Sequence, residues 1–312
     1  MAEESKQKPK NNWRWLVDAY DQSQKLRIAM EGRGRAVSQG KDDAPNLAHL
    51  AADIVHRMKR IEEDLAKAME RELVLHPAWP WLEAVHGIGP ILACRLVGAI
   101  DFTVATTPSK LWRYCGLGVV DGHAERRVRG QVCRYNHRLK AAMYLIGTSF
   151  LRSNSPYRQV YDQAKQRYYE LRQIVPIREL LGDEAIESFR VKQKTGAFTD
   201  EEAEREAWNT LLEQAREECQ NRNPSLSTTE LVPWTDNHVH LASLRKMTKI
   251  FLLHLWLYTR RRMGLPVRQS YAHEFLRHHP SDEYEFVSRE EVERNERKQA
   301  RRMRRTAHDE AA

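Results

Sequence analysis

Long apolar runs are missing from this chain of 312 residues, and no apolar signal core follows Met1. A membrane-spanning helix needs about 20 consecutive apolar residues, so the sequence predicts a cytoplasmic protein with no membrane partner. Cysteine is also scarce, since Cys94, Cys115, Cys133 and Cys219 lie far apart and form no CxxC pair. That spacing argues against a zinc ribbon and against a disulfide framework.

Charge of both signs is abundant, and the basic excess is moderate. The chain has 51 Lys and Arg against 43 Asp and Glu, which gives a formal net charge of +8. Such an excess indicates a polyanionic partner only where it is clustered along the chain. The hydrophobic fraction of 41% is sufficient for a packed core, and the length suits one large domain or two ordinary ones.

The spacing of apolar residues is mostly helical. Along residues 45–70 they recur every three or four positions with charge between them, which is typical of a coiled-coil seam. The partner of this helix is either a helix expected from Trp13, which would end at the glycines of residues 32–40, or the same helix of another subunit. The second alternative predicts a homo-oligomer, a dimer or higher, formed through the 45–70 helix.

The sequence therefore predicts a mainly α fold. An N-terminal coiled-coil hairpin is followed by a helical domain with a helix-hairpin-helix and a short β-ribbon or basic loop. Within the rest, residues 175–198 look like an irregular excursion, and Thr199 begins a capping box that opens an acidic helix. The predicted segments are a disordered basic tail (1–12), the coiled-coil region (13–76), the helix-hairpin-helix domain (77–174), an insertion with the acidic helix and a linker (175–233), a C-terminal helical part packing on that domain (234–286) and a charged, exposed tail helix (287–312).

One short motif dictates a backbone shape that suits binding. Gly87, Ile88, Gly89 and Pro90 occur in succession before an apolar run. Glycine allows positive φ and a close approach of other groups, and proline at the first helical position gives up an amide that would be unpaired anyway. The motif predicts a tight turn between two short helices, with the amides of the second helix turned outward. Such amides attract phosphate, so the motif indicates a helix-hairpin-helix; the alternative is a turn between two core helices.

The densest basic segment of the chain follows within about forty residues of this motif. Asp121 opens it and Glu125 is its only other acidic residue, so the positive charge is local. We expect it to contact nucleic-acid phosphates, the alternative being a solvated charged loop. The predicted contacts are Arg126, Arg127, Arg129, Arg134, Asn136, Arg138 and Lys140, with Asn136 also placed to cap the helix that follows.

No metal site, cofactor or activated nucleophile is predicted. The chain has 13 histidines, but His238 and His240 are two residues apart, which is not the spacing that puts two imidazoles on one helical face. Packing or hydrogen bonding therefore accounts better for the histidines than metal binding does. Ser149, Ser153 and Ser155 lie in no motif that activates a hydroxyl, and we expect them to cap and pack.

The order of the motifs resembles a known family of proteins. Gly87-Ile-Gly-Pro90, Leu111-Trp-Arg-Tyr-Cys-Gly-Leu117, a basic segment ending in Tyr135-Asn136 and then Arg138-Leu139 are similar to the C-terminal transposase domain of the bridge-RNA-guided insertion-sequence recombinases. The resemblance spans about residues 79–165. It implies a nucleic-acid-binding domain, adds a guide RNA as a further partner, and implies a serine nucleophile in a Ser-Gly step.

The chain departs from that pattern in two places. Asp121-Gly122 occupies the position of the Ser-Gly step, so Asp121 is the aligned candidate for catalysis. The first 76 residues leave room for the coiled coil but lack the strand pattern and acid set of the ribonuclease-H-like domain that precedes it in the family. We therefore expect a DNA-binding protein of transposase ancestry, active in transposition and recombination or in a derived accessory role.

Two alternatives remain open at this point. One is an active recombinase or a metal-dependent nuclease that uses Asp121 in place of the serine, for which Mg²⁺ would be the cofactor. The other is an oligomeric scaffold, in which the coiled coil and the acidic helix bind protein and the basic residues only keep the chain soluble.

Overall fold

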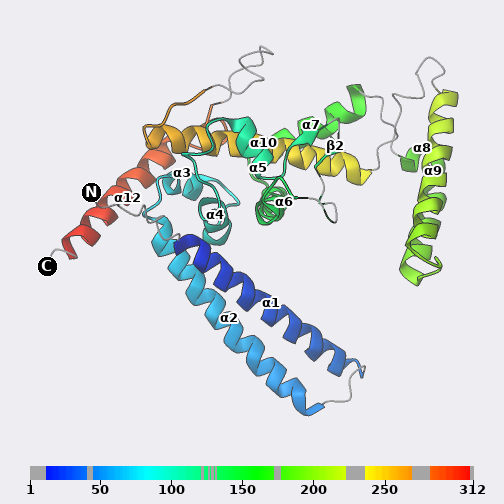
Figure 1. Ribbon diagram of the computed structural model, residues 1–312, viewed down its shortest axis with the longest axis horizontal. Coiled ribbons are helices and arrows are strands. Elements are labelled where there is room, and N and C mark those ends of the chain that lie inside the picture. The colour runs from blue at the N-terminus through cyan, green and yellow to red at the C-terminus, as the bar shows by residue number, and fades with distance from the viewer. Residues whose placement is uncertain are drawn as a thin grey trace. The chain divides into compact units, whose positions relative to one another are not determined.

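The computed structural model describes residues 12–40, 45–120, 123–125, 127, 130, 132–171, 177–222, 236–268 and 282–309. Within these ranges it contains eleven helices and one pair of two-residue strands, so the fold is mainly α, as predicted (Figure 1). The chain divides into two compact units, residues 1–156 with 248–312 and residues 157–247. No helix in the described part of the chain combines the length and the apolar character needed to cross a membrane.

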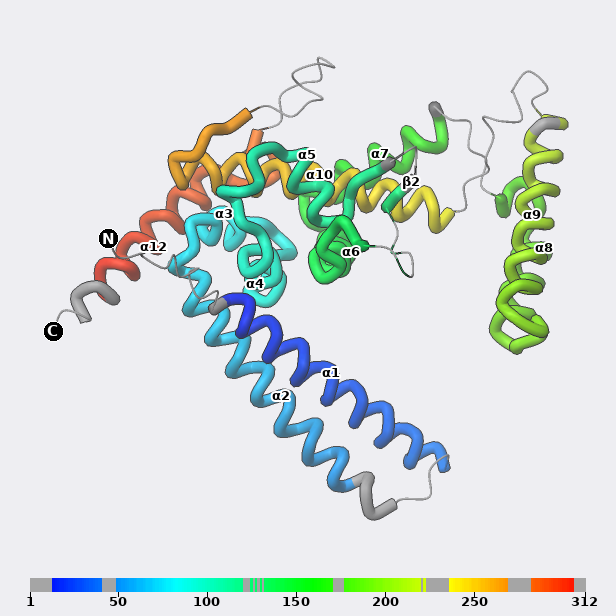
Figure 2. Tube along the Cα trace, viewed as in Figure 1, coloured from blue at the N-terminus to red at the C-terminus, as the bar shows by residue number. Residues whose placement is uncertain are grey.

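Two long helices form a hairpin in the first unit. α1 (Asn12–Ser38) and α2 (Pro45–Leu73) lie side by side, so α2 finds a partner within its own chain (Figure 2). Arg27 joins them, because its guanidinium pairs with Glu62 of α2 at 2.7 Å. The predicted break at Gly32 and Gly34 is wrong: both lie inside α1, and each of them costs only about 1 kcal/mol relative to alanine in a helix.

Short helices and one long helix build the core of the first unit. They are α3 (Trp79–Ala84), α4 (Pro90–Val97), α5 (Pro108–Tyr114), α6 (His137–Arg152) and α10 (Asp236–Arg262), the last of which enters this unit at residue 248. Phe251 of α10 contacts Trp81 of α3 and Phe150 of α6, with ring centroids 5.7 and 5.2 Å apart. Thr107 and Asn136 cap α5 and α6 as predicted.

The C-terminal helix α12 (Arg289–Asp309) has one buried side up to Gln299 and is exposed all round at residues 300–305, whereas an exposed tail helix was predicted. Val292, Asn295 and Gln299 are buried. The Asn295 amide donates to the carbonyl of Pro80 at 3.2 Å, and the Gln299 amide donates to that of Val74 at 2.6 Å. Because these contacts reach α3 and the residues before it, α12 is a docked element of the first unit.

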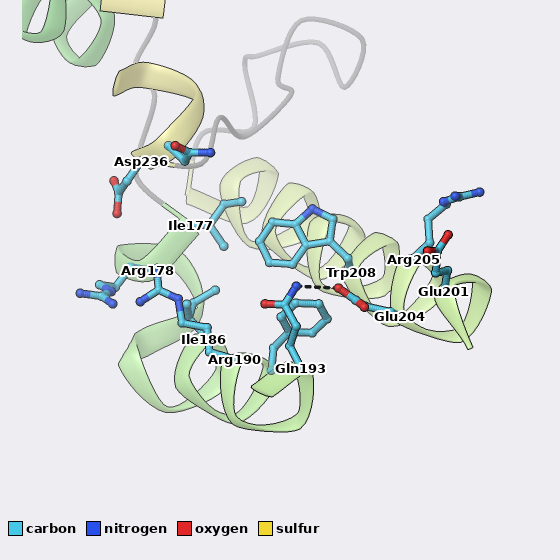
Figure 3. A pocket seen from close by; sticks show the side chains of 12 residues that line it. Ile177, Arg178, Ile186, Arg190, Gln193, Glu201, Glu204, Arg205, Trp208 and Asp236 are labelled. Carbon is cyan, nitrogen blue, oxygen red and sulfur yellow. Dashed lines mark hydrogen bonds between the residues drawn. The ribbon is translucent and has the colours of Figure 1, made fainter. Parts of the chain in front are cut away.

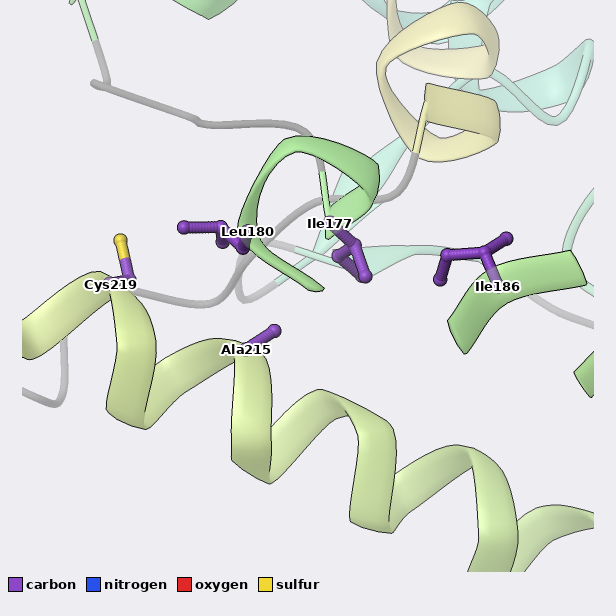
Figure 4. Close-up of a cluster of buried hydrophobic side chains, with 5 residues drawn as sticks. All are labelled: Ile177, Leu180, Ile186, Ala215 and Cys219. Carbon is purple, nitrogen blue, oxygen red and sulfur yellow. The ribbon is translucent and has the colours of Figure 1, made fainter. Parts of the chain in front are cut away.

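The second unit contains α7 (Arg158–Leu171), α8 (Ile177–Thr195) and α9 (Glu201–Arg222). The excursion predicted around residues 175–198 is thus largely helical, with a kink at Gly182 where φ is +80°. The cap of α9 is Asp200 and not Thr199, because the Asp200 carboxylate accepts the Ala203 amide at 2.8 Å. A small cluster of buried side chains joins α8 to α9 (Figure 4), namely Ile177, Leu180, Ile186, Ala215 and Cys219.

Candidate nucleic-acid interface

The turn between α3 and α4 is held from behind by α6. Gly87 has φ +98°, a conformation that side chains other than that of glycine rarely allow. A Cβ at this position would lie 2.6 Å from the Ser153 hydroxyl and 3.1 Å from the Phe150 ring. The Ser149 hydroxyl donates to the Gly87 carbonyl at 2.7 Å. Both backbone conformation and space therefore require glycine, and α6 fixes the position of the turn.

The start of α4 is open on its outer side. Gly89 is exposed and extended (φ −101°, ψ 174°), and a Cβ there would meet no atom within 4 Å. No side chain in the described ranges caps α4, and Pro90 occupies its first turn as predicted. The amides of Ile91 and Leu92 consequently have no side-chain acceptor, which is the arrangement that binds anions at a helix N-terminus.

The beginning of the basic segment is pinned against the end of α5. β1 (Val119–Val120) and β2 (His123–Ala124) pair antiparallel, with Val120 opposite His123. Glu125, just after β2, ion-pairs with Arg113 of α5 at 3.5 Å. The two residues between the strands, Asp121 and Gly122, lie outside the described residues.

The end of the basic segment is pinned at Gly116. This glycine has φ +70°, and a Cβ there would lie 2.8 Å from the Lys140 side chain and 2.9 Å from the Tyr135 ring. The Lys140 ammonium donates to the Glu125 carbonyl at 2.5 Å and lies 4.6 Å from the centroid of the Tyr135 ring. Lys140, one of the predicted phosphate contacts, is thus used to hold the two ends of the segment together.

Asn136 and Arg138 also make contacts within the protein. The Asn136 carbonyl oxygen accepts the amides of Arg138 and Leu139 at 3.0 and 3.2 Å, and its amide donates to the Tyr114 hydroxyl at 3.3 Å. The Arg138 guanidinium forms an ion pair with Asp18 of α1. Both residues therefore position α6, and the Arg138 nitrogen that pairs with Asp18 is not open to a phosphate while that ion pair is made.

Two predicted contacts remain exposed and turned to solvent, namely Arg127 and Arg134. Within the described ranges neither of them makes an ion pair. Arg126 and Arg129, like Asp121, lie outside the described residues. The structure thus separates the predicted set into residues that hold the segment and residues that offer charge.

Residues of α1 belong to this region although the sequence reasoning did not include them. Asp18 pairs with Arg138 of α6, and Asp21 pairs with Arg95 of α4. Their spacing of three residues on a helix was the available signal, because it places both carboxylates on one face. Nothing in the sequence shows which cations lie opposite that face.

The serine hydroxyls at the end of α6 and two of the histidine rings are buried in the protein. The Ser153 and Ser155 hydroxyls are buried and make no hydrogen bond within the described part of the chain. Burial lowers the pKa of His76 to about 4 and that of His254 to about 4, which keeps both rings neutral at pH 7. Among the described residues, no three His, Cys, Asp or Glu side chains come close enough together to hold a metal ion.

Acidic and thiol groups near the turn are likewise occupied or inert. The Asp101 carboxylate accepts the Thr103 hydroxyl and amide at 2.5 and 2.9 Å, which lowers its pKa. Burial raises the pKa of the Cys94 thiol to about 12 and also raises the pKa of Cys115. At pH 7 the Asp101 carboxylate is therefore ionised and hydrogen-bonded, and both thiols are protonated.

The second unit contains a cavity of about 620 Å³ between α8, α9 and the start of α10 (Figure 3). Phe189 and Trp208 supply its apolar wall, with ring centroids 5.1 Å apart. Two of its polar groups are hydrogen-bonded to each other, since the Gln193 amide donates to the Glu204 carboxylate at 2.6 Å. With basic and acidic side chains mixed along its wall, this cavity is a poor match for a phosphate chain.

Residues 80–162 match the model of the family described as Transposase IS116/IS110/IS902. This segment is therefore similar to the transposase domain of that family. It contains the turn at Gly87, the strand pair and the cap at Asn136, in the order on which the resemblance rests. Neither the comparison with curated proteins nor the comparison with solved structures gives a match. The family match thus supports mobile-element ancestry for this part of the chain.

Proposed function

We propose that the protein binds nucleic acid, DNA in the first place, through the turn of the transposase domain and the arginine segment at residues 126–138. It acts in transposition and recombination or in a derived accessory role. The observation that carries this proposal is the open start of α4 at Gly89, held out by α6 in the same domain as the arginines. Amides and guanidinium groups both bind phosphate, so one strand could be contacted by both elements.

Phosphate contacts have a measurable signature. Each neutralised phosphate of duplex DNA contributes about 0.9 to the slope of log affinity against log salt. Contacts of this kind carry little sequence information, so affinity should vary steeply with salt and little with sequence. A protein that used its basic residues only for solubility would give no such slope.

The test compares two triple variants of the full chain. Arg126→Ala/Arg127→Ala/Arg129→Ala removes cations of the segment, whereas Arg57→Ala/Arg60→Ala/Lys67→Ala removes exposed cations of α2 and changes the net charge equally. Filter binding with a labelled 30-base-pair duplex should show a slope lower by about 2.7 for the first variant and unchanged for the second. An unchanged slope in both would remove the segment from the interface.

The same assay addresses the kind of nucleic acid. Unlabelled duplex DNA, single-stranded DNA and structured RNA are added as competitors at equal phosphate concentration. The proposal requires duplex DNA to compete at least as well as the others. Stronger competition by RNA would instead make a guide RNA the first partner.

A second candidate function is strand cleavage or transfer at Asp121. The pairing of Val120 with His123 brings the flanks of the Asp121-Gly122 step together, and this step aligns with the Ser-Gly step of the family. Supercoiled and branched DNA incubated with Mg²⁺ or Mn²⁺ should then yield products that Asp121→Asn abolishes. No product with either metal, or equal product from Asp121→Asn, would reject the activity.

We further propose that the α1–α2 hairpin mediates self-association. Large apolar side chains remain exposed on it, namely Trp15, Leu26 and Ile28 on α1 with Leu50 and Ile61 on α2. Light scattering should give a mass above that of one chain, and Leu50→Gln/Ile61→Gln should lower it. A monomeric wild type would reject the proposal and leave the nucleic-acid interface unaffected.

A further inference from the structure

Cations form a stripe along the exposed side of α12. The stripe consists of Arg294, Arg297, Lys298, Arg301 and Arg305, all of them exposed. Their spacing of three or four residues places them on one helical face. With Arg302 they line a hollow of about 560 Å³, and the sequence contains no acidic residue from Arg297 to His308.

The opposite face of α12 anchors this stripe. Val292 is fully buried, and the Asn295 and Gln299 amides donate to carbonyls at Pro80 and Val74. The Lys298 ammonium pairs with Glu83 of α3 at 2.7 Å, so this part of the stripe lies beside the helix that precedes the turn at Gly87. Up to Gln299, a ligand would therefore meet charges on a helix that the protein already holds in place.

The stripe is short of negative charge. Within the described ranges, Lys298 pairs with Glu83 and Arg294 pairs with Glu291, whereas no ion pair involves Arg297 or Arg301. Like charges four residues apart on a helix destabilise it. A bound polyanion would relieve this repulsion.

The helix dipole does not explain the stripe. A dipole favours cations at a helix C-terminus, but its effect falls off within the last turn. α12 ends at Asp309, and Arg294 lies about four turns before that end. Most of the stripe is therefore placed where the dipole contributes little.

We propose that the α12 stripe binds the phosphate backbone of a nucleic acid. It would be a second contact surface besides the turn between α3 and α4. From Arg294 to Arg305 the helix rises about 16 Å, which matches about five phosphates of one strand. Four of the five cations are arginine, whose planar fork suits phosphate oxygens. An anionic membrane fits less well, because an interfacial helix needs a broad exposed apolar face, whereas on α12 Val292 is buried and Met303 is the one large apolar side chain exposed among the described residues.

The proposal about the stripe rests on the proposed function. Its test uses the full-length protein with a labelled 30-base-pair duplex. Arg297→Gln/Arg301→Gln/Arg305→Gln is compared with Arg57→Gln/Arg60→Gln/Lys67→Gln, which removes the same charge from α2. The stripe variant should lower the salt slope by about 2.7, and the α2 variant should leave it unchanged. Arg297→Gln/Arg301→Gln, with a drop of about 1.8, serves if the triple variant melts early.

Different outcomes separate the two proposals. Equal salt slopes for the stripe and α2 variants overturn the proposal that the stripe binds nucleic acid. They leave the proposed interface at the turn between α3 and α4 unaffected. A lowered slope for the stripe variant, with no effect of Arg126→Ala/Arg127→Ala/Arg129→Ala, overturns the segment and supports the stripe. Stripe-dependent binding to phosphatidylserine vesicles without any change in the DNA slope would identify a membrane surface and overturn the proposal. A wild type that binds no duplex at low salt overturns both.

Discussion

The turn between α3 and α4 and the arginine segment at residues 126–138 differ in how neighbouring residues contact them. In the turn, α6 fixes Gly87 through the Ser149 hydroxyl and leaves the start of α4 without a capping side chain. In the segment, Lys140 and Asn136 are engaged by the protein itself, while Arg127 remains exposed. Residues that hold the interface are thus distinct from residues that offer charge, although both kinds occur in one short stretch.

The largest effect on this comparison should come from Gly87→Ala. Positive φ with a side chain costs about 1–2 kcal/mol, and the overlap with Ser153 and Phe150 adds about 1–3 kcal/mol. Urea unfolding should therefore show a free energy of unfolding lower by about 2–5 kcal/mol. The matched control is Gly89→Ala, which meets open space and should change stability by less than about 1 kcal/mol. Equal losses in the two variants would contradict the role given to α6.

Acid should lower the free energy of unfolding through His76 while the arginines keep their charge. The Ala78 amide donates to Nδ1 of buried His76, which requires the neutral ring. Burial lowers the pKa of His76 from 6.5 to about 4, so the unfolded chain binds more protons between those values. His76 then contributes up to about 3 kcal/mol that is fully present above pH 6.5 and lost as the pH falls toward 4.

The measurement is the free energy of unfolding of wild type and of His76→Gln from pH 7 to pH 4. His254 titrates in the same window, so the difference between the two proteins isolates His76. The variant should lose less stability over this range than wild type. Parallel curves would show that His76 is not buried as a neutral ring.

Removing charge from the segment should affect binding more than stability. Arg127→Gln/Arg134→Gln should lower the salt slope by about 1.8 and weaken binding roughly tenfold, or about 1.4 kcal/mol. Lys140→Met is the control, because it removes a cation that the protein already uses. We expect Lys140→Met to reduce the melting temperature and to leave the salt slope unchanged. If Lys140→Met lowered the slope as much as Arg127→Gln/Arg134→Gln does, Lys140 would be a phosphate contact like the two arginines.

The smallest effect should come from the cap of α6. Asn136→Ala removes an acceptor for two amides and should cost about 1 kcal/mol in unfolding free energy. Asn136→Asp retains the acceptor and should restore most of it. If Asn136→Ala weakens DNA binding more than it lowers stability, then Asn136 is a contact residue as well as a cap.

Local sequence signals predicted the parts of the fold that local physics decides. The caps at Thr107 and Asn136 and the turn at Gly87 follow from side-chain acceptors and backbone freedom. The signals failed where distant contacts decide. Gly32 and Gly34 stay helical because α2 packs along α1, and α12 is docked because its polar Asn295 and Gln299 find carbonyls more than 200 positions away.

The same limit applies to the candidate site. The sequence predicted which residues carry charge, but the pairing of Arg138 with Asp18 and of Lys140 with a carbonyl depends on tertiary contacts. Charge density along a chain therefore overestimates the charge that is available to a ligand. Arg127 and Arg134 were distinguished from Arg138 only by their surroundings in the structure.

The ion pair between Arg138 and Asp18 links the site to the α1–α2 hairpin. A phosphate that takes the Arg138 nitrogen held by Asp18 displaces this carboxylate, and occupation of the site and attachment of α1 are then reciprocal equilibria. Each would weaken the other by the same factor. Asp18→Asn should then tighten DNA binding and loosen α1, and a partner that stabilises the attached hairpin would act as an antagonist of DNA.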